Sequence, residues 1–597
     1  MTLFLPLNLW RKIFLVVVSL MLITSVGLAE AKYKNKKPII LKPVAFDKSA
    51  TLREMAAARI TPSKFPDEEA KEIRTERGAV PPDKGHSGDG ALQTFNGRTS
   101  ATSPVIPGPL SNFEGLSNLD NFNIFGGRVN PPDPVGDVGP NHYVEMINLV
   151  FGVYSKTGTL LLGPVDSGTL WANFPIEDCT DPSGDPIVLY DQLADRWLLS
   201  QFTTRGLADP ELPFYNCVAI SQTGDPTGAY YRYAFITQAD PDGGYFFPDY
   251  PKYGVWRDTY VLTTRDFGSD DGYGISVYGL EKNKMIDGNP NARAVQFFLD
   301  IDIVPLNLVG DGLLPADIDG HKKPKNSATI PIVGTQDDGS GYGGTIDAIN
   351  IWDFDVKWRS TPIASIVLAA QIPVAAFDSI FPCGPSRGCI PQPGIANTDQ
   401  WLDILSYRQR PTWRLAYRNF KDYESLVTNQ AVEATPGVAG VRWYEIRRNE
   451  EGAYSLYQQG TYAPSDGVHR WMGSIAQDKE GNMALGYSVS NATTVYPGIR
   501  YTGRLDGDAL GQMTLGEGVV INGTGVQTTT NSRWGDYTSM NIDPSDDCTF
   551  WYVNEYYEVS GLPIPLPPPP LPPPGTTAPW QTRIGSFKLP GCEADDD

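Results

Sequence analysis

Residues 184–200, GDPIVLYDQLADRWLLS, contain the pattern that decides the fold. A turn-forming Gly-Asp-Pro leads into an apolar strand-like run, a polar turn follows, and a second apolar run ends the phrase. The same order recurs along the chain, with starts near residues 133, 185, 249, 317, 403, 471 and 536. Seven copies of a unit that holds about four strand-like segments predict an all-β fold, specifically a seven-bladed β-propeller.

Short strands separated by polar turns are also typical of sandwiches and barrels, but neither repeats one unit seven times. Chance similarity between turns is the alternative explanation of the repeat. A propeller must also close its ring, and the last unit shows fewer strand-like segments than the others. We therefore expect part of Asn112–Phe125 to pair with the last unit.

The N-terminus has the features of a secretory signal peptide. Arg11 and Lys12 precede the apolar run Ile13–Leu28, and Ala29-Glu30-Ala31 provides a small-x-small cleavage site. An uncleaved membrane anchor is the alternative, but the apolar run is short for a bilayer span. The sequence predicts cleavage, export to the periplasm, the cell surface or the medium, and no transmembrane segment in the mature chain.

The chain carries 48 basic and 69 acidic residues, which gives a net charge of −21. Such a surface repels nucleic acid and anionic lipid, so neither is expected as a partner. Solvation is the simplest role of the excess negative charge, and binding of cations or cationic partners is the alternative.

An even number of cysteines in an exported chain indicates disulfide bonds. The six are Cys179, Cys217, Cys383, Cys389, Cys548 and Cys592. Several pairings are open, and order along the chain favours 179–217, 383–389 and 548–592. No Cys-x-x-Cys pair occurs, so a zinc ribbon or a thioredoxin-like motif is not expected.

Composition divides the chain into regions around a β-rich body. Residues 1–31 are the signal peptide, and residues 32–110 are interpreted as a mobile, largely disordered leader because Pro, Gly, Ser and Thr dominate much of them. The propeller is expected over residues 111–592, with a proline-rich loop at 562–574, and residues 593–597 form an acidic tail.

Several motifs resemble a widespread group of exported bacterial proteins. They are Trp534-Gly535-Asp536-Tyr537 followed by Asp543-Pro544, Thr549-Phe550-Trp551 and Glu555-Tyr556; Arg470-Trp471-Met472-Gly473-Ser474-Ile475; Pro131–Pro140; and Asp249-Tyr250-Pro251-Lys252. The resemblance covers roughly residues 130–592. Because that group has no established activity, the resemblance implies a β-propeller and export but no mechanism.

The repeat places a polar residue at the start of the innermost strand of each unit, near one opening of the channel. These candidate ligand-binding residues are Asp133, Asp185, Asp249, Asp317, Asp403, Arg470, Arg533 and Asp536. Clustered carboxylates repel unless a cation or the two arginines neutralise them, so a cation or polar ligand is one interpretation. The other is that each aspartate caps a turn by accepting backbone N–H groups, and repetition along the chain favours it.

Calcium is the one cofactor that the composition suggests, because the chain is rich in carboxylates and poor in histidine. The weak candidate ligands are Asp240, Asp242, Asp317 and Asp319, and the Asp337-Asp338-Gly339 turn is similar. None completes an EF-hand loop, and ordinary aspartate–glycine turns are the alternative.

Two classes of function remain open. The main interpretation is a non-catalytic binding or scaffold protein with an unknown protein or glycan partner, because no nucleophile elbow or histidine metal motif occurs. The alternative is a glycan-active hydrolase or lyase at the channel mouth, where clustered arginines grip a carboxylate rather than pair between units. The arginines are Arg442, Arg447, Arg448, Arg470, Arg500, Arg504 and Arg533, with Glu445, Glu555, Tyr444 and Tyr501 as candidate catalytic partners.

Overall fold

The computed structural model describes residues 37–58, 87–94, 105–237, 245–268, 272–381, 388–404, 409–529, 531–563 and 576–593. This described part is built mainly of β-strands. The signal peptide, residues 564–575 around the proline-rich loop, and residues 594–597 of the tail lie outside it.

Antiparallel strands form groups that follow one another along the chain. The first group is β4 (Val135–Val138), β5 (His142–Ile147), β6 (Val150–Ser155) and β7 (Leu160–Asp166); the second is β8 (Ile187–Asp191), β9 (Arg196–Phe202), β10 (Tyr215–Ser221) and β11 (Ala229–Ile236); the third is β12 (Phe247–Val255), β13 (Thr259–Phe267), β14 (Tyr273–Glu281) and β15 (Ala294–Asp300). The fourth is β16 (Leu314–Asp319), β17 (Ile330–Gln336), β18 (Ala348–Lys357) and β19 (Ile363–Pro373); the fifth is β22 (Thr412–Asn419), β23 (Glu424–Thr435), β24 (Val438–Arg448) and β25 (Tyr454–Tyr462). The sixth is β26 (His469–Gln477), β27 (Met483–Ser490), β28 (Tyr496–Arg504) and β29 (Glu517–Gly523); the seventh is β30 (Ser539–Ile542), β31 (Thr549–Tyr557) and β32 (Trp580–Lys588).

Short elements lie between the strands, some within a group and others between groups. They are η2 (Ser167–Trp171), α4 (Glu177–Thr180), α5 (Arg205–Ala208), α6 (Lys282–Ile286), α7 (Leu306–Val309), β20 (Gly388–Ile390), η3 (Thr398–Gln400) and β21 (Leu402–Asp403). Within the described ranges, no helix combines the length and the apolar character that a membrane crossing requires.

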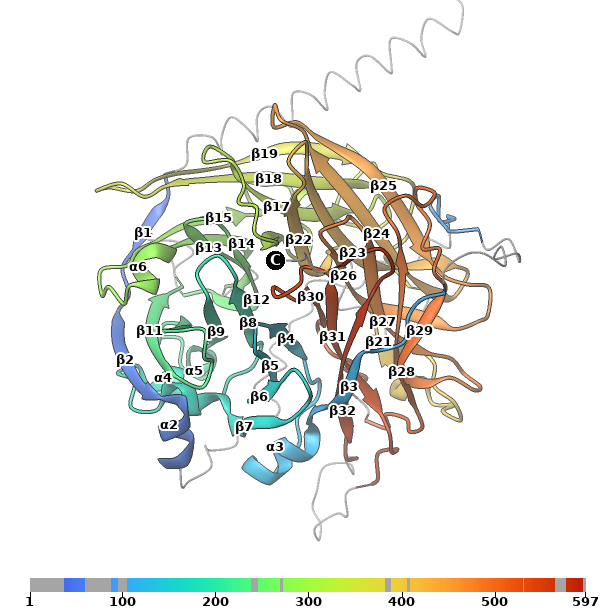
Figure 1. The fold of residues 1–597 in the computed structure, drawn as a ribbon, viewed down its shortest axis with the longest axis horizontal. Coiled ribbons are helices and arrows are strands. Elements are labelled where there is room, and N and C mark those ends of the chain that lie inside the picture. The colour runs from blue at the N-terminus through green and yellow to red at the C-terminus, as the bar shows by residue number, and fades with distance from the viewer. Residues whose placement is uncertain are drawn as a thin grey trace, which may run out of the picture.

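The first strands of the groups stand side by side in a closed circle. β4 lies against β8, β8 against β12, β12 against β16, β22 against β26, β26 against β30, and β30 against β4. β16 and β22 pair in parallel, with Ala316 opposite Leu415, which joins the fourth and fifth groups into one eight-stranded sheet. Figure 1 shows the remaining strands extending outward from this circle. The described chain is therefore all-β, as the sequence predicts, and its sheets surround a central axis.

Buried aromatic rings fill the space between neighbouring sheets. Trp197, Trp256 and Trp551 are 0%, 2% and 2% exposed. Trp551 stacks on Tyr143 of the first group with 5.3 Å between ring centroids, which joins the last group to the first. Large rings suit this position because sheets that radiate from an axis separate towards the rim. These tryptophans therefore pack the core, as expected, and are not exposed platforms for a sugar.

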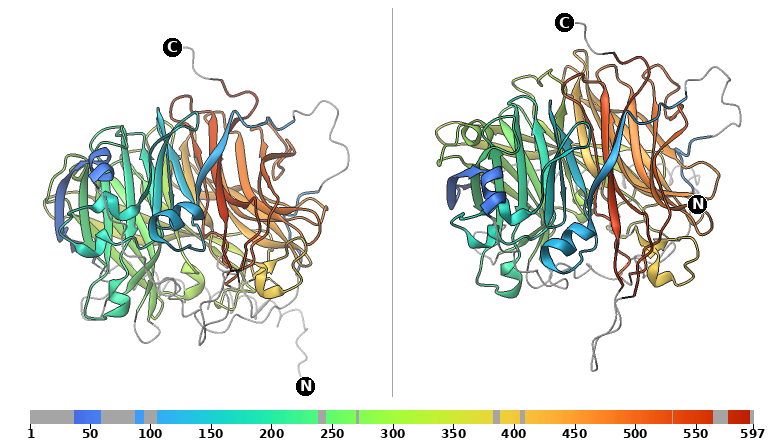
Figure 2. Two further views of the ribbon diagram at one scale, coloured as in Figure 1. Left: turned by 90° about the horizontal axis from the view of Figure 1, so that it is seen from below. Right: turned by 60° about the horizontal axis from the view of Figure 1, so that its bottom comes forward.

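Part of the region interpreted as a mobile leader is ordered. β1 (Ile39–Leu41) pairs with β15, and β2 (Ala45–Thr51) pairs with β11. α2 (Leu52–Ala58) follows and buries Leu52 and Met55. Figures 1 and 2 show these segments at the outer rim of the molecule. The expectation of a mobile leader does not hold for these residues, because β11 and β15 have outer backbone edges that the segment satisfies.

β3 (Ser111–Ser117) completes the seventh group. It pairs with β32, with Phe113 opposite Ile584, so the expected pairing of an upstream segment with the last unit is confirmed for these residues. The following residues instead form the helix α3 (Asn118–Phe125), which begins with a capping box at Ser117. A capping box satisfies backbone N–H groups at the start of a helix, which explains why the strand ends there.

Two of the expected disulfides are present. They join Cys179 to Cys217 and Cys548 to Cys592. Cys389 is also disulfide-bonded, and its expected partner Cys383 lies outside the described residues.

Candidate functional site

The ring has two ends, which we name by what lies there. At the aspartate end the first strands begin, and at the turn end they finish and turn into the second strands. Asp133, Asp185, Tyr250 and Met472 lie at the aspartate end with left-handed backbone φ values of 47°, 44°, 53° and 52°. This shared conformation underlies the sequence repeat, and aspartate is one of the residues that adopt it most readily.

Asp133 and Asp185 bridge neighbouring groups through backbone N–H donors. Asp133 Oδ1 accepts a hydrogen bond from the backbone N of Asp536, and its Oδ2 accepts one from Asn148 Nδ2, both at 2.8 Å. Asp185 Oδ2 accepts from the backbone N of Tyr250 at 3.1 Å. The prediction that aspartates accept backbone N–H groups where units meet is confirmed for these two residues.

Arg470 does not join the other candidates, although the repeat places it among them. The left-handed residue of its unit is Met472, two positions later. Arg470 instead forms ion pairs at 2.8 Å with Asp466 and with Glu517, which belong to its own group. Arg470 is the second residue of β26, two positions before the left-handed residue, so it does not occupy the position that Asp133 and Asp185 hold in their units.

The remaining candidates at the aspartate end are paired with arginine. Asp249 Oδ2 lies 3.6 Å from Arg265 Nη1. Arg533 Nε lies 3.4 Å from Asp403 Oδ2, and Arg533 also pairs with Asp536. The expectation that aspartates and Arg533 gather at one end of the ring therefore agrees with the contacts, and their charges are largely matched internally.

Asp317 and Asp319 flank a buried arginine. Arg414 Nε lies 2.9 Å from Asp317 Oδ2, and Arg414 Nη2 lies 2.5 Å from Asp319 Oδ1. Arg414 also donates to the carbonyl of Met540 across the ring at 3.1 Å. A guanidinium thus occupies the position that the calcium interpretation gave to a cation. The other weak calcium candidates, Asp240 and Asp242, lie outside the described residues.

Asp337, Asp338 and Asp347 each place one carboxylate oxygen within 4.8 Å of the others. Asp347 accepts hydrogen bonds from the backbone N of Asp338 and of Phe377, both at 3.0 Å. Asp337 accepts from the backbone N of Ser379 at 2.9 Å. These contacts are those of aspartates that stabilise turns, which was the alternative to calcium for this segment.

Sequence reasoning missed the residues that complete the centre of the aspartate end. Lys252 Nζ lies 3.4 Å from the ring centroid of Tyr250 and 3.8 Å from that of Tyr537. The Arg410 guanidinium lies 3.6 Å from the Tyr250 centroid. The available signal was a lysine at the start of the apolar run Lys252–Trp256, because lysine is rarely buried without a specific partner.

Burial changes the pKa values of these central groups. Burial, followed by the charge of Asp536, raises the pKa of Asp133 to about 6. Burial, followed by the charges of neighbouring aspartates, raises the pKa of Asp185 well above its ordinary value, and burial does the same for Glu555. Burial lowers the pKa of Lys252 to about 7. Asp185 is half-buried, whereas Asp133 and Asp536 are 2% and 3% exposed, so Asp185 is the most accessible of these three aspartates.

The arginines of the C-terminal half do not converge on one site. Arg442 pairs with Asp89, Arg447 with Glu445, Arg448 with Glu424 and Arg500 with Glu517, while Arg504 donates to Gln458 and to the carbonyl of Asp508. The candidate partners Tyr444 and Tyr501 bond to Gln430 and to the carbonyl of Pro107. The arginines are therefore paired, as the alternative interpretation expected, but with acids of their own unit or of the N-terminal region rather than between units.

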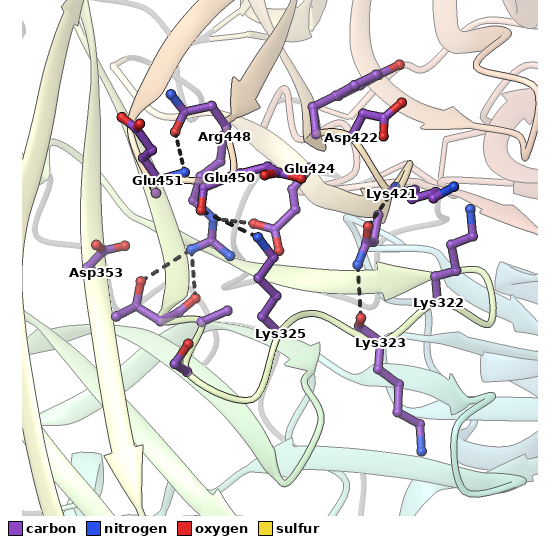
Figure 3. Close-up of a pocket in the computed structure, with 17 residues that line it drawn as sticks. Lys322, Lys323, Lys325, Asp353, Lys421, Asp422, Glu424, Arg448, Glu450 and Glu451 are labelled. Carbon is purple, nitrogen blue, oxygen red and sulfur yellow. Dashed lines mark hydrogen bonds and ion pairs between the residues drawn. The ribbon is translucent and has the colours of Figure 1, made fainter.

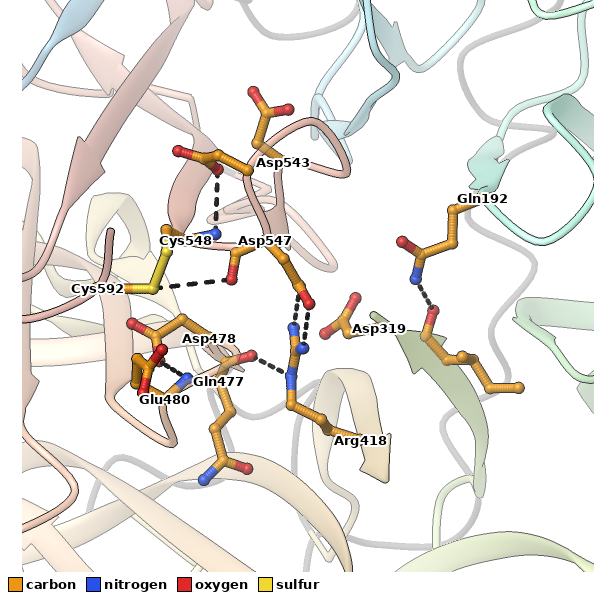
Figure 4. Close-up of polar contacts among 12 residues, drawn as sticks. Gln192, Asp319, Arg418, Gln477, Asp478, Glu480, Asp543, Asp547, Cys548 and Cys592 are labelled. Carbon is orange, nitrogen blue, oxygen red and sulfur yellow. Dashed lines mark hydrogen bonds and ion pairs between the residues drawn. A yellow bond between two sulfur atoms is a disulfide. The ribbon is translucent and has the colours of Figure 1, made fainter. Parts of the chain in front are cut away.

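Polar side chains also meet at the turn end (Figure 4). Arg418 donates two hydrogen bonds to Asp547, at 2.8 and 2.7 Å, and one to the carbonyl of Gln477 at 2.9 Å. A cavity of about 550 Å³ at this end is lined by turn residues that include His142 and His321. None of the site residues expected from the sequence lines this cavity.

A second cavity, of about 610 Å³, lies between turns of the fourth and fifth groups (Figure 3). Its charged lining residues are Lys322, Lys323, Lys325, Lys421 and Arg448, and Asp353, Asp422, Glu424, Glu450 and Glu451. Arg448 and Glu424 pair with each other. Because five basic residues face five acidic ones, the lining has no net charge to select an ionic ligand.

No family model and no curated protein matches the chain. Solved structures match it at low similarity. An endo-arabinase from Bacteroides thetaiotaomicron is 14% identical over 53% of this chain and 92% of its own, with a TM-score of 0.25. An α-L-arabinofuranosidase from Fusarium graminearum is 10% identical over 68% and 94%, with a TM-score of 0.31. An α-L-arabinanase from Penicillium chrysogenum is 8% identical over 68% and 94%, with a TM-score of 0.23.

These matches correct one expectation. The matched proteins are glycan-active enzymes by their own descriptions, and this finding overturns the interpretation of a non-catalytic binding or scaffold protein. At these TM-scores the likeness carries no argument about a substrate or about catalytic residues in this chain, which must come from the site itself.

Proposed function

We propose that the chain is a seven-bladed β-propeller and a glycan-active hydrolase whose reaction centre lies at the aspartate end. The closed circle of first strands, each leading its own antiparallel group, supports the propeller. The polar cluster at one end of the circle supports a reaction centre, because groups with strongly shifted pKa values gather at functional sites.

The observation that carries the catalytic proposal is the pair of Asp185 and Asp249. The Tyr250 N–H donates to Asp185 at 3.1 Å, so the Asp185 carboxyl lies beside the residue that follows Asp249. Asp249 faces the Arg265 guanidinium, whereas burial and neighbouring carboxylates raise the pKa of Asp185 well above its ordinary value. Glycoside hydrolysis uses two carboxyl groups in such contrasting environments.

Each carboxyl has a defined role in this proposal. Asp185, whose pKa burial and neighbouring carboxylates raise, is the acid: it gives its proton to the oxygen of the departing sugar as the bond to the anomeric carbon breaks. Asp249 acts on that carbon, either directly or through a water molecule from which it takes a proton. Asp185 is half-buried, whereas Asp133 and Asp536 are buried, which favours Asp185 over these two as the acid.

Hydrolysis is favoured over a lyase reaction. A lyase requires a base that removes a proton next to a carboxylate, and Lys252, Tyr250 and Tyr537 are the candidates at the centre. Lys252 is 0% exposed and donates to the carbonyl of Pro251, which keeps its amine away from a substrate. Burial raises the pKa values of Tyr250 and Tyr537, which makes both phenols poor bases at neutral pH.

Export is part of the proposal, to the periplasm, the cell surface or the medium. The disulfides Cys179–Cys217 and Cys548–Cys592 support it, because such bonds persist in oxidising compartments. A glycan outside the cytoplasm is the corresponding substrate class.

The test is release of reducing sugar from a panel of glycans that includes arabinan, arabinoxylan, xylan, levan and pectin. We expect Asp185→Asn and Asp249→Asn to lower the rate by about 100-fold or more. Asp185→Asn keeps the fold, because it replaces a protonated carboxyl by a neutral group of the same shape. The matched control is Asp478→Asn, which changes a buried aspartate that caps the turn at Asn482. Full activity of Asp185→Asn, or no release from any glycan, would contradict the proposal.

A further inference from the structure

Lys252 lies at the centre of the aspartate end in a position unusual for a lysine. The residue is 0% exposed, and its ammonium lies between the rings of Tyr250 and Tyr537. Its hydrogen-bond acceptor is the carbonyl of the preceding residue, Pro251, at 2.9 Å. Tyrosine faces attract a cation when water is excluded, so the two rings provide a specific place for the charge.

The titratable and charged groups that face Lys252 come from five groups of strands. They are Tyr250 of β12, Asp133 ahead of β4, Asp185 ahead of β8, Arg410 ahead of β22, and Asp536 and Tyr537 ahead of β30. Asp249, Arg265, Arg533 and Glu555 surround these groups in turn. The lysine therefore lies among aspartates from several groups, with Arg410 as a second cation against the Tyr250 ring.

Lys252 forms no ion pair with the carboxyls of the described chain, so any effect on their ionisation is exerted over a longer distance. Within the described chain, no carboxylate oxygen lies within 4.0 Å of Lys252 Nζ, whereas the other buried lysine, Lys282, pairs with Asp191 at 2.6 Å. Asp133 and Asp185 instead bind backbone N–H groups of neighbouring units. These carboxyls can therefore gain or lose a proton while their backbone partners hold them in place.

The Lys252 ammonium influences how many of the neighbouring carboxyls are ionised. Each neighbouring carboxylate opposes ionisation of the others, and the ammonium favours it, so the number of protons in the cluster depends on Lys252. Arg410 and Arg533 are also near, but a guanidinium does not lose its proton in this pH range. Lys252 alone among these cations has a pKa that burial lowers to about 7.

We infer that Lys252 is a positioning residue whose ammonium, held between two tyrosine rings, sets how Asp133, Asp185 and Asp536 share protons. Its effect on catalysis acts through Asp185 and rests on the proposed function. Its effect on the protonation of the folded chain is independent of the proposed function, because that effect exists without a substrate.

The first experiment measures the unfolding equilibrium by urea between pH 5 and pH 7, for the wild type, Lys252→Met, Lys252→Arg and the control Lys42→Met, which changes an exposed lysine. In Lys252→Met the pKa values of Asp133 and Asp185 rise further, so the folded chain keeps protons that the unfolded chain has lost. We expect its unfolding constant to increase more steeply with pH, by up to about tenfold per pH unit for one proton. Lys252→Arg keeps the charge and follows the wild-type profile, and so does Lys42→Met.

Equal pH profiles for Lys252→Met and the wild type would overturn the inference, as would a Lys252→Arg profile that matches Lys252→Met. If Lys252→Met does not fold, the reciprocal measurement is a titration of ¹³C-labelled lysine by NMR in Asp133→Asn. Loss of that carboxylate lowers the titration midpoint of Lys252 by half a pH unit or more, and an unchanged midpoint would refute the coupling.

The catalytic consequence has a separate readout. If a glycan is hydrolysed, the alkaline limb of the pH–rate profile moves to higher pH in Lys252→Met and returns to its wild-type position in Lys252→Arg, which a purely structural role would not produce. If no glycan is hydrolysed, the proposed function fails, while the unfolding experiment still decides the role of Lys252.

Discussion

Asp89 forms a buried ion pair that links the N-terminal region to the fifth group. Its Oδ1 lies 3.2 Å from Arg442 Nη1, and both side chains are 0% exposed. Thr461 Oγ1 donates to Asp89 Oδ2 at 2.7 Å. Nearby, the Gln93 side chain exchanges two hydrogen bonds with the backbone of Met513. A segment rich in turn-forming residues is thus held by a few polar contacts that the local sequence does not reveal.

At the residue scale we predict that Asp89→Ala costs about 3–5 kcal/mol of unfolding free energy, because it leaves the Arg442 guanidinium buried without its counter-charge. The matched control is Arg53→Ala, which breaks the exposed pair Arg53–Asp225, whose side chains are 61% and 39% exposed. That change costs less than about 1 kcal/mol. Urea unfolding measures the loss of unfolding free energy in both variants. Similar losses would show that the buried pair stabilises the fold no more than the exposed pair.

Strand pairing at the rim makes the N-terminal region part of the fold at the element scale. The composition of residues 32–110 predicts that deletion to residue 100 barely changes the melting temperature. The pairing of β1 with β15 and of β2 with β11 predicts the opposite. Deletion exposes two strand edges and removes the helix that buries Leu52 and Met55.

We therefore expect a chain that begins at residue 59 to be about 3–6 kcal/mol less stable than one that begins at residue 37, from the two buried side chains alone. A chain that begins at residue 128 loses β3 as well, which leaves the β32 edge unpaired and lowers the melting temperature further. Thermal unfolding of the three chains measures this order. Equal melting temperatures for the first two would show that β1, β2 and α2 contribute nothing to stability.

At the scale of the whole molecule, buried carboxyls dominate the response to pH. Burial is the first cause that raises the pKa of Glu145 to about 8 and of Asp266 to about 7. The pKa values of Asp178, Asp317 and Asp478 are raised to about 6 in the same way. Such groups bind a proton more tightly in the folded chain, so the stability they contribute is complete below the unfolded pKa of about 4 and is lost as pH rises through 6 to 8.

We predict that the unfolding free energy is highest in mildly acidic solution and falls between pH 5 and pH 8, by about 1.4 kcal/mol per pH unit for each proton retained only in the folded state. Asp266→Asn tests one such group, because its carboxyl is bonded to the hydroxyls of Thr264 and Ser276 and an amide has the same shape. The substitution removes one titrating group, so the unfolding free energy of the variant falls less steeply between pH 4 and pH 7. The control is Asp546→Asn, since hydrogen bonds lower the pKa of Asp546. Stability that rises from pH 5 to pH 8 would contradict the prediction.

The sequence by itself determined the local structure, namely where strands and turns lie and that they repeat, and order along the chain favoured the cysteine pairs 179–217 and 548–592 that the structure contains. These features depend on residues close in sequence or on pairing order, as the phrase at Asp185 shows, where a left-handed aspartate precedes an apolar strand. The sequence also placed Asp133, Asp185 and Asp536 at one end of the ring, because equivalent positions of a repeat share one place.

Only the tertiary structure decided which charges meet. Asp249 and Arg470 do not hold the position of Asp133 and Asp185, because the left-handed residues of their units are Tyr250 and Met472, one and two positions later. Lys252 lies near carboxyls that are far away in the sequence. β1 pairs with the edge of β15, and β2 pairs with the edge of β11. Such contacts depend on the closure of the whole ring, since electrostatic fields and free strand edges exist only after distant segments have been brought together.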